Sequence, residues 1–255
     1  MKPTLDLFFF EIPLYSALVI AGAVVGLIGA YLFLRAQARR SARWSMFLDA
    51  ALVALIAGWI GARAYHVALN WEYYLARPNE IAQIGLGGLA LRGALIAGLI
   101  ALALYARARR VSFLPIADAG ARGLALGQAI GWLGAWVHGA HYGALNDSRF
   151  ALDVPDLYGI VQTRFPFQLA ESILFASLFL VLLFVATRAS HAGDLVLAYL
   201  LIASPANFLL GFVRGDETIY LAGLRFDQIV DAGLCALALG GIAIQQWRIR
   251  SLIVA

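Results

Sequence analysis

Long runs of apolar residues constrain the fold of this chain more than any other feature of its sequence. A helix needs about 20 residues to cross the hydrocarbon core of a bilayer, which is about 30 Å thick. Runs of roughly this length recur along all 255 residues. We therefore predict an all-α, polytopic integral membrane protein with about seven transmembrane helices. The predicted spans are 14–34, 46–69, 84–106, 116–138, 167–187, 194–213 and 226–246.

The composition excludes a soluble globular protein. Hydrophobic residues make up 62% of the chain and charged residues 13%, with a mean hydropathy of +0.82. A soluble domain carries about 25% charged residues, so lipid must be the solvent for most of this surface. No polar linker divides the chain, which predicts a single transmembrane domain over residues 1–255. The lone cysteine, Cys235, forms no internal disulfide, and the N-terminal segment lacks the pattern of a cleavable signal peptide.

The positions of the basic residues predict the orientation in the membrane. Ten arginines fall on one side of the predicted spans, whereas the loops on the other side carry mixed charge. Basic loops stay in the cytoplasm, so we predict an external N-terminus and a cytoplasmic C-terminus. The net charge of +4 then reports topology rather than nucleic-acid binding. The ten residues are Arg35, Arg39, Arg40, Arg43, Arg107, Arg109, Arg110, Arg188, Arg248 and Arg250.

The fourth predicted span is more polar than the others and rich in glycine, which is typical of a helix buried among other helices. Asp118 and Arg122 lie four residues apart, so we expect them to form an ion pair on one helix face. Glycines at helical spacing in the first and fourth spans predict close helix packing. They are Gly22, Gly26, Gly29, Gly123, Gly127 and Gly131.

Ionisable residues within the spans are candidates for function, because each costs several kcal/mol unless it is paired or hydrated. The predicted topology places five of them in the outer half of the bundle: Arg63, Arg92, Arg214, His138 and His141. One interpretation is structural, with each arginine at the interface or paired with an acid of the outer loops; Asp216, Glu217 and Asp227 are within reach of Arg214. The other is a cationic pocket for the phosphate of a phospholipid. No metal site is predicted.

Several motifs along the chain belong together. They are Ile12-Pro13-Leu14-Tyr15, Gly61-Ala62-Arg63, the segment 87–93, the segment 126–143 (LGQAIGWLGAWVHGAHYG), Pro166 with Gln168 and Glu171, Phe212-Val213-Arg214, and Gln228. In this order they resemble the prolipoprotein diacylglyceryl transferase (Lgt) family over nearly the whole chain. The resemblance implies a multi-pass protein of the bacterial inner membrane.

The resemblance also implies an activity. The family transfers a diacylglyceryl group from phosphatidylglycerol to the cysteine thiol of a lipobox-containing preprotein, forming a thioether and releasing glycerol phosphate. Such chemistry requires a base for the thiol and cations for the departing phosphate. Positions that fit lipid or phosphate binding are Arg63, Arg92, Arg214, Gln168, Gln228, Gly139 and Gly143, and no cofactor other than a bound phospholipid is expected.

Several positions depart from the family signature. Trp132 stands at its arginine, Ala135 and His138 at its two asparagines, Ala140 at its glutamate, and Arg92 at the histidine of the third helix. The resemblance therefore leaves the enzymatic activity open. These replacements favour a catalytically degenerate, phospholipid-binding protein that acts as an accessory subunit beside other membrane subunits.

Two alternatives remain. The first is an active transferase with an altered site, in which His138, His141 and Tyr15 are the catalytic candidates. The second is a transporter or channel, which intramembrane arginines permit. Against the latter, the two halves of the chain show no internal similarity.

Overall fold

The computed structural model describes residues 4–7, 10–37, 44–83 and 87–254. The chain forms two compact units, of which the first comprises residues 1–33 and 118–255 and the second comprises residues 34–117. The single transmembrane domain stays a prediction.

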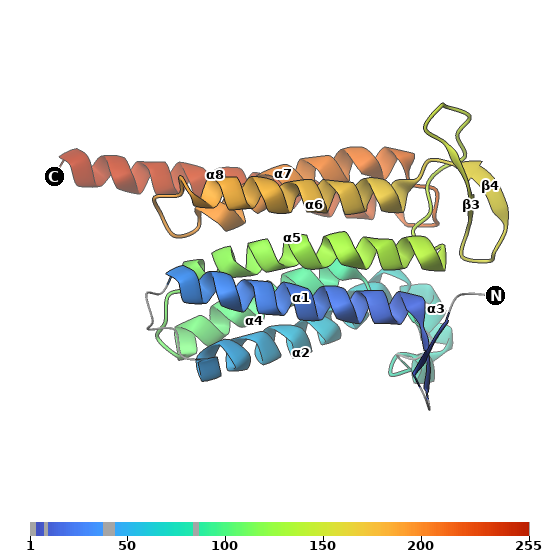
Figure 1. The fold of residues 1–255 in the computed structure, drawn as a ribbon, viewed down its shortest axis with the longest axis horizontal. Helices are drawn as coiled ribbons and strands as arrows, with labels where there is room; N and C mark the ends of the chain where they lie inside the picture. The colour runs from blue at the N-terminus through green and yellow to red at the C-terminus, as the bar shows by residue number, and fades with distance from the viewer. Residues whose placement is uncertain (1–3, 8–9, 38–43, 84–86, 255) are drawn as a thin grey trace. The chain divides into compact units, whose positions relative to one another are not determined.

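Within its described residues, the first unit is built on five long helices (Figure 1). They are α1 (Leu14–Gln37), α5 (Phe113–His138), α6 (Phe167–Ala186), α7 (Asp194–Leu210) and α8 (Phe226–Val254). Helices α6, α7 and α8 pack in sequence order. Alanines of α5 pack against Phe175, Leu178 and Tyr199 of α6 and α7 to form the core. The small alanine side chains let these helices approach closely.

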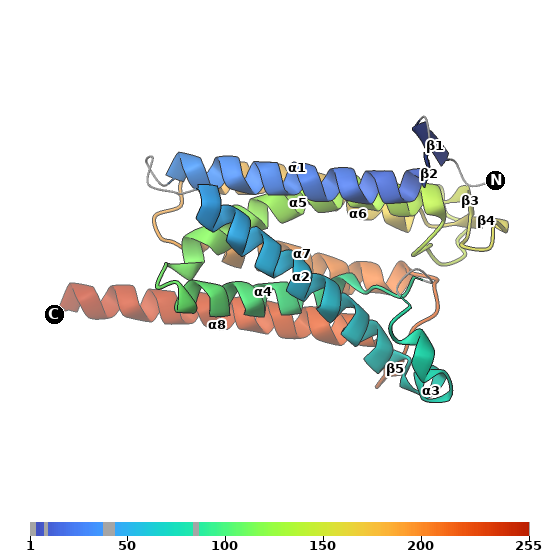
Figure 2. The same ribbon diagram turned by 90° about the horizontal axis from the view of Figure 1, so that it is seen from below.

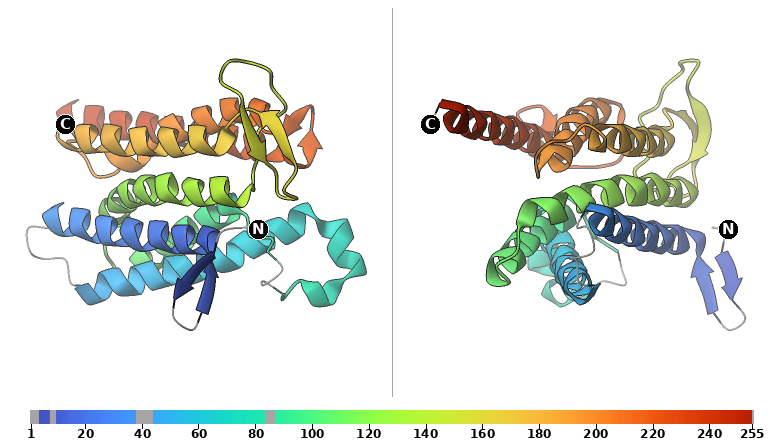
Figure 3. Two further views of the ribbon diagram at one scale, coloured as in Figure 1. Left: turned by 45° about the vertical axis from the view of Figure 1, so that its right-hand side comes forward. Right: turned by 60° about the vertical axis from the view of Figure 1, so that its left-hand side comes forward.

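Short antiparallel hairpins complete the first unit. They pair β1 (Thr4–Leu7) with β2 (Phe10–Pro13), β3 (Leu152–Pro155) with β4 (Val161–Arg164), and β5 (Tyr220–Leu221) with β6 (Leu224–Arg225). A 3₁₀ turn, η3 (Gly211–Val213), follows α7. The β3–β4 hairpin lies beside the first turn of α6 (Figure 3). Sequence reasoning predicted none of these hairpins.

The second unit pairs two long helices, α2 (Trp44–Leu69) and α4 (Leu91–Ala108) (Figure 2). Between them lie the short helix α3 (Trp71–Ala76) and the 3₁₀ turn η1 (Pro78–Glu80). Gly61 and Gly93 face each other where α2 crosses α4, and a Cβ atom on either would clash with the backbone carbonyl of the other. The two glycines therefore allow the helices to cross in direct backbone contact.

Six of the seven predicted spans coincide with a helix, in the described part of the chain, that could cross a membrane. Six helices of the described residues are long and apolar enough to cross a bilayer: α1, α2, α4, α6, α8, and α7 extended through Val213. The chain is an all-α polytopic membrane protein. Helix α5, at 26 residues, is long enough to cross a bilayer. It is more polar than these six helices and is not among the candidate membrane spans. Two of its polar side chains bind α7: Asp118 accepts from backbone N–H groups at the start of that helix, and Gln128 accepts from the hydroxyl of Tyr199 at 2.5 Å.

The expected ion pair between Asp118 and Arg122 is not formed in the described structure. The Asp118 carboxylate instead accepts hydrogen bonds from the backbone N–H groups of Gly193, Leu195 and Val196, at 2.7, 3.1 and 2.9 Å. The Arg122 guanidinium lies over the ring of Phe33, 4.4 Å from its centroid. Unsatisfied N–H groups at the start of a helix attract a carboxylate strongly, so Asp118 caps α7.

One predicted helix start was wrong. The third span was predicted from residue 84, but α4 begins at Leu91; residues 84–86 lie outside the described residues. Gly87 and Gly88 adopt φ values of +85° and +77°, a left-handed conformation that ends helical geometry. The last span, predicted over 226–246, is confirmed as the membrane-spanning part Phe226–Trp247 of the longer helix α8.

Candidate functional site

The candidate site lies at one end of the first unit. Helices α1, α6 and α8 begin at this end, and α5 and α7 finish there. The two connectors at this end, 139–166 and 211–225, are held together by backbone hydrogen bonds. Ala144 N donates to Val213 O at 2.8 Å, and Gly215 N donates to Tyr142 O at 2.9 Å. The connector after α5 is thereby fixed against the connector after α7, which brings His141 and Arg214 together.

Two glycines predicted as binding residues allow the first connector to fold tightly. Gly139 has φ +76°, and a Cβ atom there would lie 2.5 Å from the carbonyl oxygen of Asp156. A Cβ atom on Gly143 would clash with the carbonyl of Phe165. Both glycines are therefore required by the backbone, and their contact with lipid stays a prediction.

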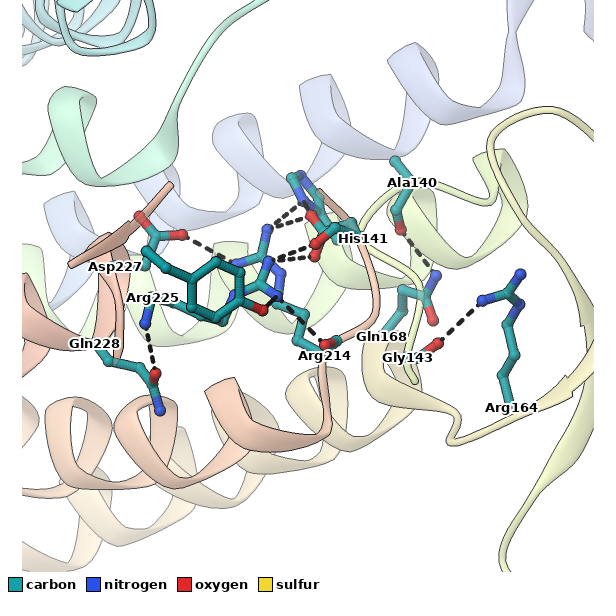
Figure 4. A network of polar contacts seen from close by, with 11 residues as sticks. Ala140, His141, Gly143, Arg164, Gln168, Arg214, Arg225, Asp227 and Gln228 are labelled. Carbon is teal, nitrogen blue, oxygen red and sulfur yellow. Dashed lines mark hydrogen bonds and ion pairs between the residues drawn. The ribbon is translucent and has the colours of Figure 1, made fainter. Parts of the chain in front are cut away.

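Arg214, immediately after η3, is the centre of a polar network (Figure 4). Its Nη1 donates to Asp227 Oδ2 at 3.1 Å and its Nη2 donates to Asp216 Oδ2 at 2.6 Å. The same Nη2 lies 2.8 Å from Nδ1 of His141, which is itself 3.3 Å from Asp216 Oδ2. The predicted pairing of Arg214 with acids of the outer loops is confirmed for Asp216 and Asp227.

Arg225 forms a second layer of this network, and sequence reasoning missed it. Its side chain is 3% exposed, and its Nη2 donates to Asp216 Oδ1 at 2.7 Å and to Asp216 O at 2.9 Å. Gln228, a predicted site residue, accepts from the backbone N of Arg225 at 2.9 Å and donates to Phe208 O at 2.9 Å. Gln228 thus positions Arg225, which in turn holds Asp216. The sequence signal was available, because Arg225 lies between Arg214 and Gln228 in an acid-containing connector.

The environment of Asp216 keeps it ionised. Burial alone would raise the pKa of its carboxyl group, but the hydrogen bond with His141 and the positive charge of Arg214 outweigh burial and hold the pKa below its ordinary value. Both carboxylate oxygens are engaged by guanidinium groups. Asp216 therefore remains an anion that fixes two arginines and one histidine.

Aromatic contacts surround the two histidines. His138, the last residue of α5, stacks on Tyr15 of α1 with ring centroids 4.7 Å apart. Trp132 lies edge-on to His141 and to Phe167, each at a centroid distance of 5.6 Å. The indole Nε1 of Trp132 is buried and has no hydrogen-bond acceptor within the described part of the chain. The structure thus brings all three catalytic candidates, His138, His141 and Tyr15, to this end of the unit.

Gln168 is the remaining predicted site residue of this unit. It is 1% exposed in the first turn of α6, and its Nε2 donates to the carbonyl oxygen of Ala140 at 2.8 Å. Its Oε1 is buried with no donor among the described residues. Gln168 therefore fixes the connector beside His141 and keeps one acceptor atom unused.

Arg63 and Arg92 belong to the second unit. Arg63 is 7% exposed, and its guanidinium donates to backbone carbonyls of the segment between α3 and α4, including Glu80 at 2.6 Å and Gly87 at 2.8 Å. It thereby holds that segment against α2. Arg92 lies in the first turn of α4. The convergence of these two arginines with Arg214 on one phosphate stays a prediction.

The network can perform acid–base and anion-binding chemistry. His141 is partly exposed, with 45% of its side chain accessible, and it contacts a permanent anion and a permanent cation. Among the described residues, no group of three or more His, Cys, Asp or Glu side chains could hold a metal ion.

Comparisons with known proteins identify the family of the chain. The family model of prolipoprotein diacylglyceryl transferase matches residues 3–244. The phosphatidylglycerol–prolipoprotein diacylglyceryl transferase of Thermosynechococcus vestitus is 33% identical over 244 residues, which cover 93% of this chain and 89% of the relative. The proteins of the same name from Geobacillus kaustophilus and Bacillus velezensis are 34% and 30% identical, over 86% and 88% of this chain and 84% of each relative.

Proposed function

Since the chain belongs to the prolipoprotein diacylglyceryl transferase family, we propose that it transfers the diacylglyceryl group of phosphatidylglycerol to the cysteine thiol of a prolipoprotein. It is a multi-pass protein of the bacterial inner membrane. The single observation that carries the proposal is the placement of His141 against Asp216 and Arg214. This cluster would replace the chemistry of the signature residues that the chain lacks.

His141 is the proposed general base. Nδ1 of His141 faces both a donor, Nη2 of Arg214 at 2.8 Å, and an acceptor, Asp216 Oδ2 at 3.3 Å. The base role requires the tautomer with the proton on Nδ1, in which Nδ1–H donates to Asp216 and the Arg214 N–H is directed to Asp216 Oδ2 instead of to the ring. The lone pair of Nε2 is then available. Nε2 then takes the proton of the substrate thiol, because the thiolate is the nucleophile. The sulfur forms a bond to the glyceryl carbon of the lipid as the bond from that carbon to the phosphate oxygen breaks. The electron pair leaves with glycerol phosphate, which receives the proton from His141.

The charge balance of the cluster supports this role for His141. Two guanidinium groups, of Arg214 and Arg225, face two carboxylates, of Asp216 and Asp227, so the cluster is neutral while His141 is neutral. Proton uptake by His141 adds a positive charge as negative charge grows on the leaving phosphate. Stabilisation that appears during the reaction accelerates it more than stabilisation already present in the bound state.

Two unused donors fit the phosphate. The Nε atoms of Arg214 and Arg225 are buried and have no acceptor within the described residues, although the Nη atoms of both side chains are engaged. A buried guanidinium N–H without a partner is costly. A phosphate oxygen would satisfy such a donor with a charge-assisted hydrogen bond.

A reconstituted assay tests the proposal. The purified protein is placed in vesicles containing phosphatidylglycerol, and a synthetic lipobox peptide with one cysteine is followed by mass spectrometry for diacylglyceryl addition. We expect transfer by the wild type, and His141→Ala should lower kcat at least about 100-fold, the usual contribution of a general base. His191→Ala is the matched control at the opposite end of α6 and should retain wild-type activity. Full activity of His141→Ala would refute the assignment of the base.

A second function is favoured by Trp132. Its indole contacts both His141 and Phe167 and carries no charge at the position where the family signature has arginine. A bulky apolar group there suits a protein that holds a phospholipid without reacting it, beside other membrane subunits. In that case the assay gives no diacylglyceryl peptide, while native mass spectrometry of the purified protein detects retained phospholipid and the additional subunits.

A further inference from the structure

A groove opens at the opposite end of the first unit from His141. It has a volume of about 530 Å³ and is bounded by the end of α6, the start of α7 and residues 242–246 of α8. Pockets of 300–1,000 Å³ are the usual size for small-molecule ligands. None of the proposed catalytic groups lies in this groove, so its role is separate from transfer.

The part of the groove deeper in the bundle is apolar. Val185 of α6, Leu197 and Leu201 of α7, and Ile242 of α8 form its walls. Leu201 lies seven residues along α7 from Asp194, which corresponds to about 10 Å along the helix axis. The walls therefore suit a hydrocarbon chain lying parallel to the helices.

The part at the helix ends is polar. Asp194 lines it, but its carboxylate already accepts from the backbone N–H groups of Ser190 and His191, at 3.0 and 2.9 Å, and from Gln245 Nε2 at 2.7 Å. These three neutral donors hold the Asp194 carboxylate in place at the base of α7. Arg188 also lines the groove, and its guanidinium lies over the ring of Phe184, 3.7 Å from the centroid.

Arg188 is the cation of the groove. No ion pair of its side chain is found in the described part of the chain, and the residue is exposed just beyond the last turn of α6. A guanidinium stacked on an aromatic ring keeps its N–H edge directed outward, where it can grip a phosphate with two hydrogen bonds. The amide of Gln246, also in the lining, adds a neutral hydrogen-bonding group.

We propose that this groove is a binding site for an anionic phospholipid, with the phosphate on Arg188 and one acyl chain along α7 and α8. The order of polar and apolar lining along the helices matches the order of headgroup and chain in a phospholipid. The predicted topology places this end in the cytoplasmic leaflet, where anionic headgroups attract basic side chains. The site does not depend on the proposed transfer reaction.

The test uses a phosphatidylglycerol that carries a photoreactive diazirine in one acyl chain. The full-length protein is reconstituted in phosphatidylcholine nanodiscs containing this probe, irradiated and mapped by peptide mass spectrometry. We expect labelling of the α7 and α8 peptides that line the groove. A phosphatidylcholine probe with the same chain should label them less, because its headgroup carries no net charge.

Three variants locate the interaction. Arg188→Ala should lower groove labelling about five-fold, the effect of one basic residue near an anionic headgroup, whereas Arg250→Ala, which removes an exposed arginine from α8 outside the groove, should not. Ala198→Trp should abolish labelling by filling the groove while melting with the wild type. Equal labelling of Arg188→Ala and wild type overturns the proposal. Loss of labelling when free glycerol phosphate is added also overturns it, because the groove would then bind a soluble phosphate instead of a phospholipid. Groove labelling tests the lipid site at Arg188, and peptide transfer tests the proposed transferase activity. One of these two results can therefore be negative while the other is positive.

Discussion

Asp216 is the residue on which the polar network of the site depends most. It accepts from Arg214 and Arg225 and lies within hydrogen-bond distance of His141. Removing an anion from among buried cations leaves uncompensated charge, which costs about 3–5 kcal/mol when one partner of a buried pair is lost. Asp216 is therefore expected to support both the stability of this end and the orientation of His141.

The pH dependence of Asp216→Asn tests this role. The folded-state pKa of Asp216 is below its ordinary value, so its contribution to stability is full above the unfolded pKa of about 3.9 and is lost as the pH falls towards the folded pKa. We expect wild-type protein in detergent to melt well above Asp216→Asn at pH 7, and the gap in Tm to narrow below about pH 4. The control Asp147→Asn, at an exposed position of the first connector, should melt with the wild type at pH 7. A gap that widens in acid would contradict the assignment.

At the scale of elements, α1 and α5 are joined by glycines. A Cβ atom on Gly22 would lie 2.5 Å from the carbonyl oxygen of Gly127, and one on Gly26 would lie 2.7 Å from that of Gly123. The obstacle in each case is backbone, which cannot rotate away as a side chain can. The close helix packing predicted from these glycines is thus confirmed at Gly22, Gly26, Gly123 and Gly127. Gly131, by contrast, has no atom within 4 Å of the Cβ position.

Two alanine substitutions on α5 distinguish a glycine in backbone contact with α1 from a glycine with open space around its Cβ position. Gly127→Ala should destabilise the protein by about 1–3 kcal/mol, because its methyl group meets Gly22 O at 2.7 Å. Gly131→Ala is the matched control, and it should be neutral or stabilising by up to about 1 kcal/mol because alanine favours the helix. Thermal unfolding in one detergent measures both. Equal effects of the two substitutions would argue against direct backbone packing.

Helix α7 depends on a cap from a distant part of the chain. Asp118 accepts three backbone hydrogen bonds at its start, so Asp118→Ala should lower the unfolding free energy by at least about 2 kcal/mol. Asp118→Asn keeps one oxygen acceptor, so it should lower the unfolding free energy by less than Asp118→Ala does. If Asp118 served mainly as a partner of Arg122, removal of Arg122 would have the same effect as Asp118→Ala. We expect removal of the Arg122 side chain to lower the unfolding free energy by less than Asp118→Ala, as measured by thermal unfolding in detergent.

At the scale of the whole molecule, features that arise within one stretch of chain were predictable from sequence. The apolar spans follow from length and hydropathy, and Arg214 pairs with Asp216 only two residues away. Glycine spacing also predicted close helix packing, but individual hydrogen bonds between distant segments were not predictable. The bond from Gln168 to Ala140 joins residues 28 positions apart, and Asp118 preferred α7, 75 residues away, to its helical neighbour Arg122. Short hairpins were missed because two to four residues carry too little periodicity to detect.

The orientation of the whole molecule is the prediction on which both lipid sites depend. The ten arginines on one side predict that the connector after α6 is cytoplasmic and that the connector after α5 is external. Ser148 and Ser190 are exposed residues of these two connectors, separated by α6, whose 20 residues suffice to span the hydrocarbon core. Each can be replaced by cysteine in a Cys235→Ala background, which leaves one thiol in the chain.

A membrane-impermeant thiol reagent then reports which side each connector occupies. In cells with a permeabilised outer barrier and an intact inner membrane, Ser148→Cys should react at once, and Ser190→Cys only after the inner membrane is disrupted. The reverse pattern would place His141 on the cytoplasmic side. Prolipoprotein transfer would then have to occur there, and the Arg188 groove would face the outer leaflet. If both thiols react equally before the inner membrane is disrupted, α6 does not separate the two connectors. This is the least expected result, because α6 is long and apolar enough to cross the membrane.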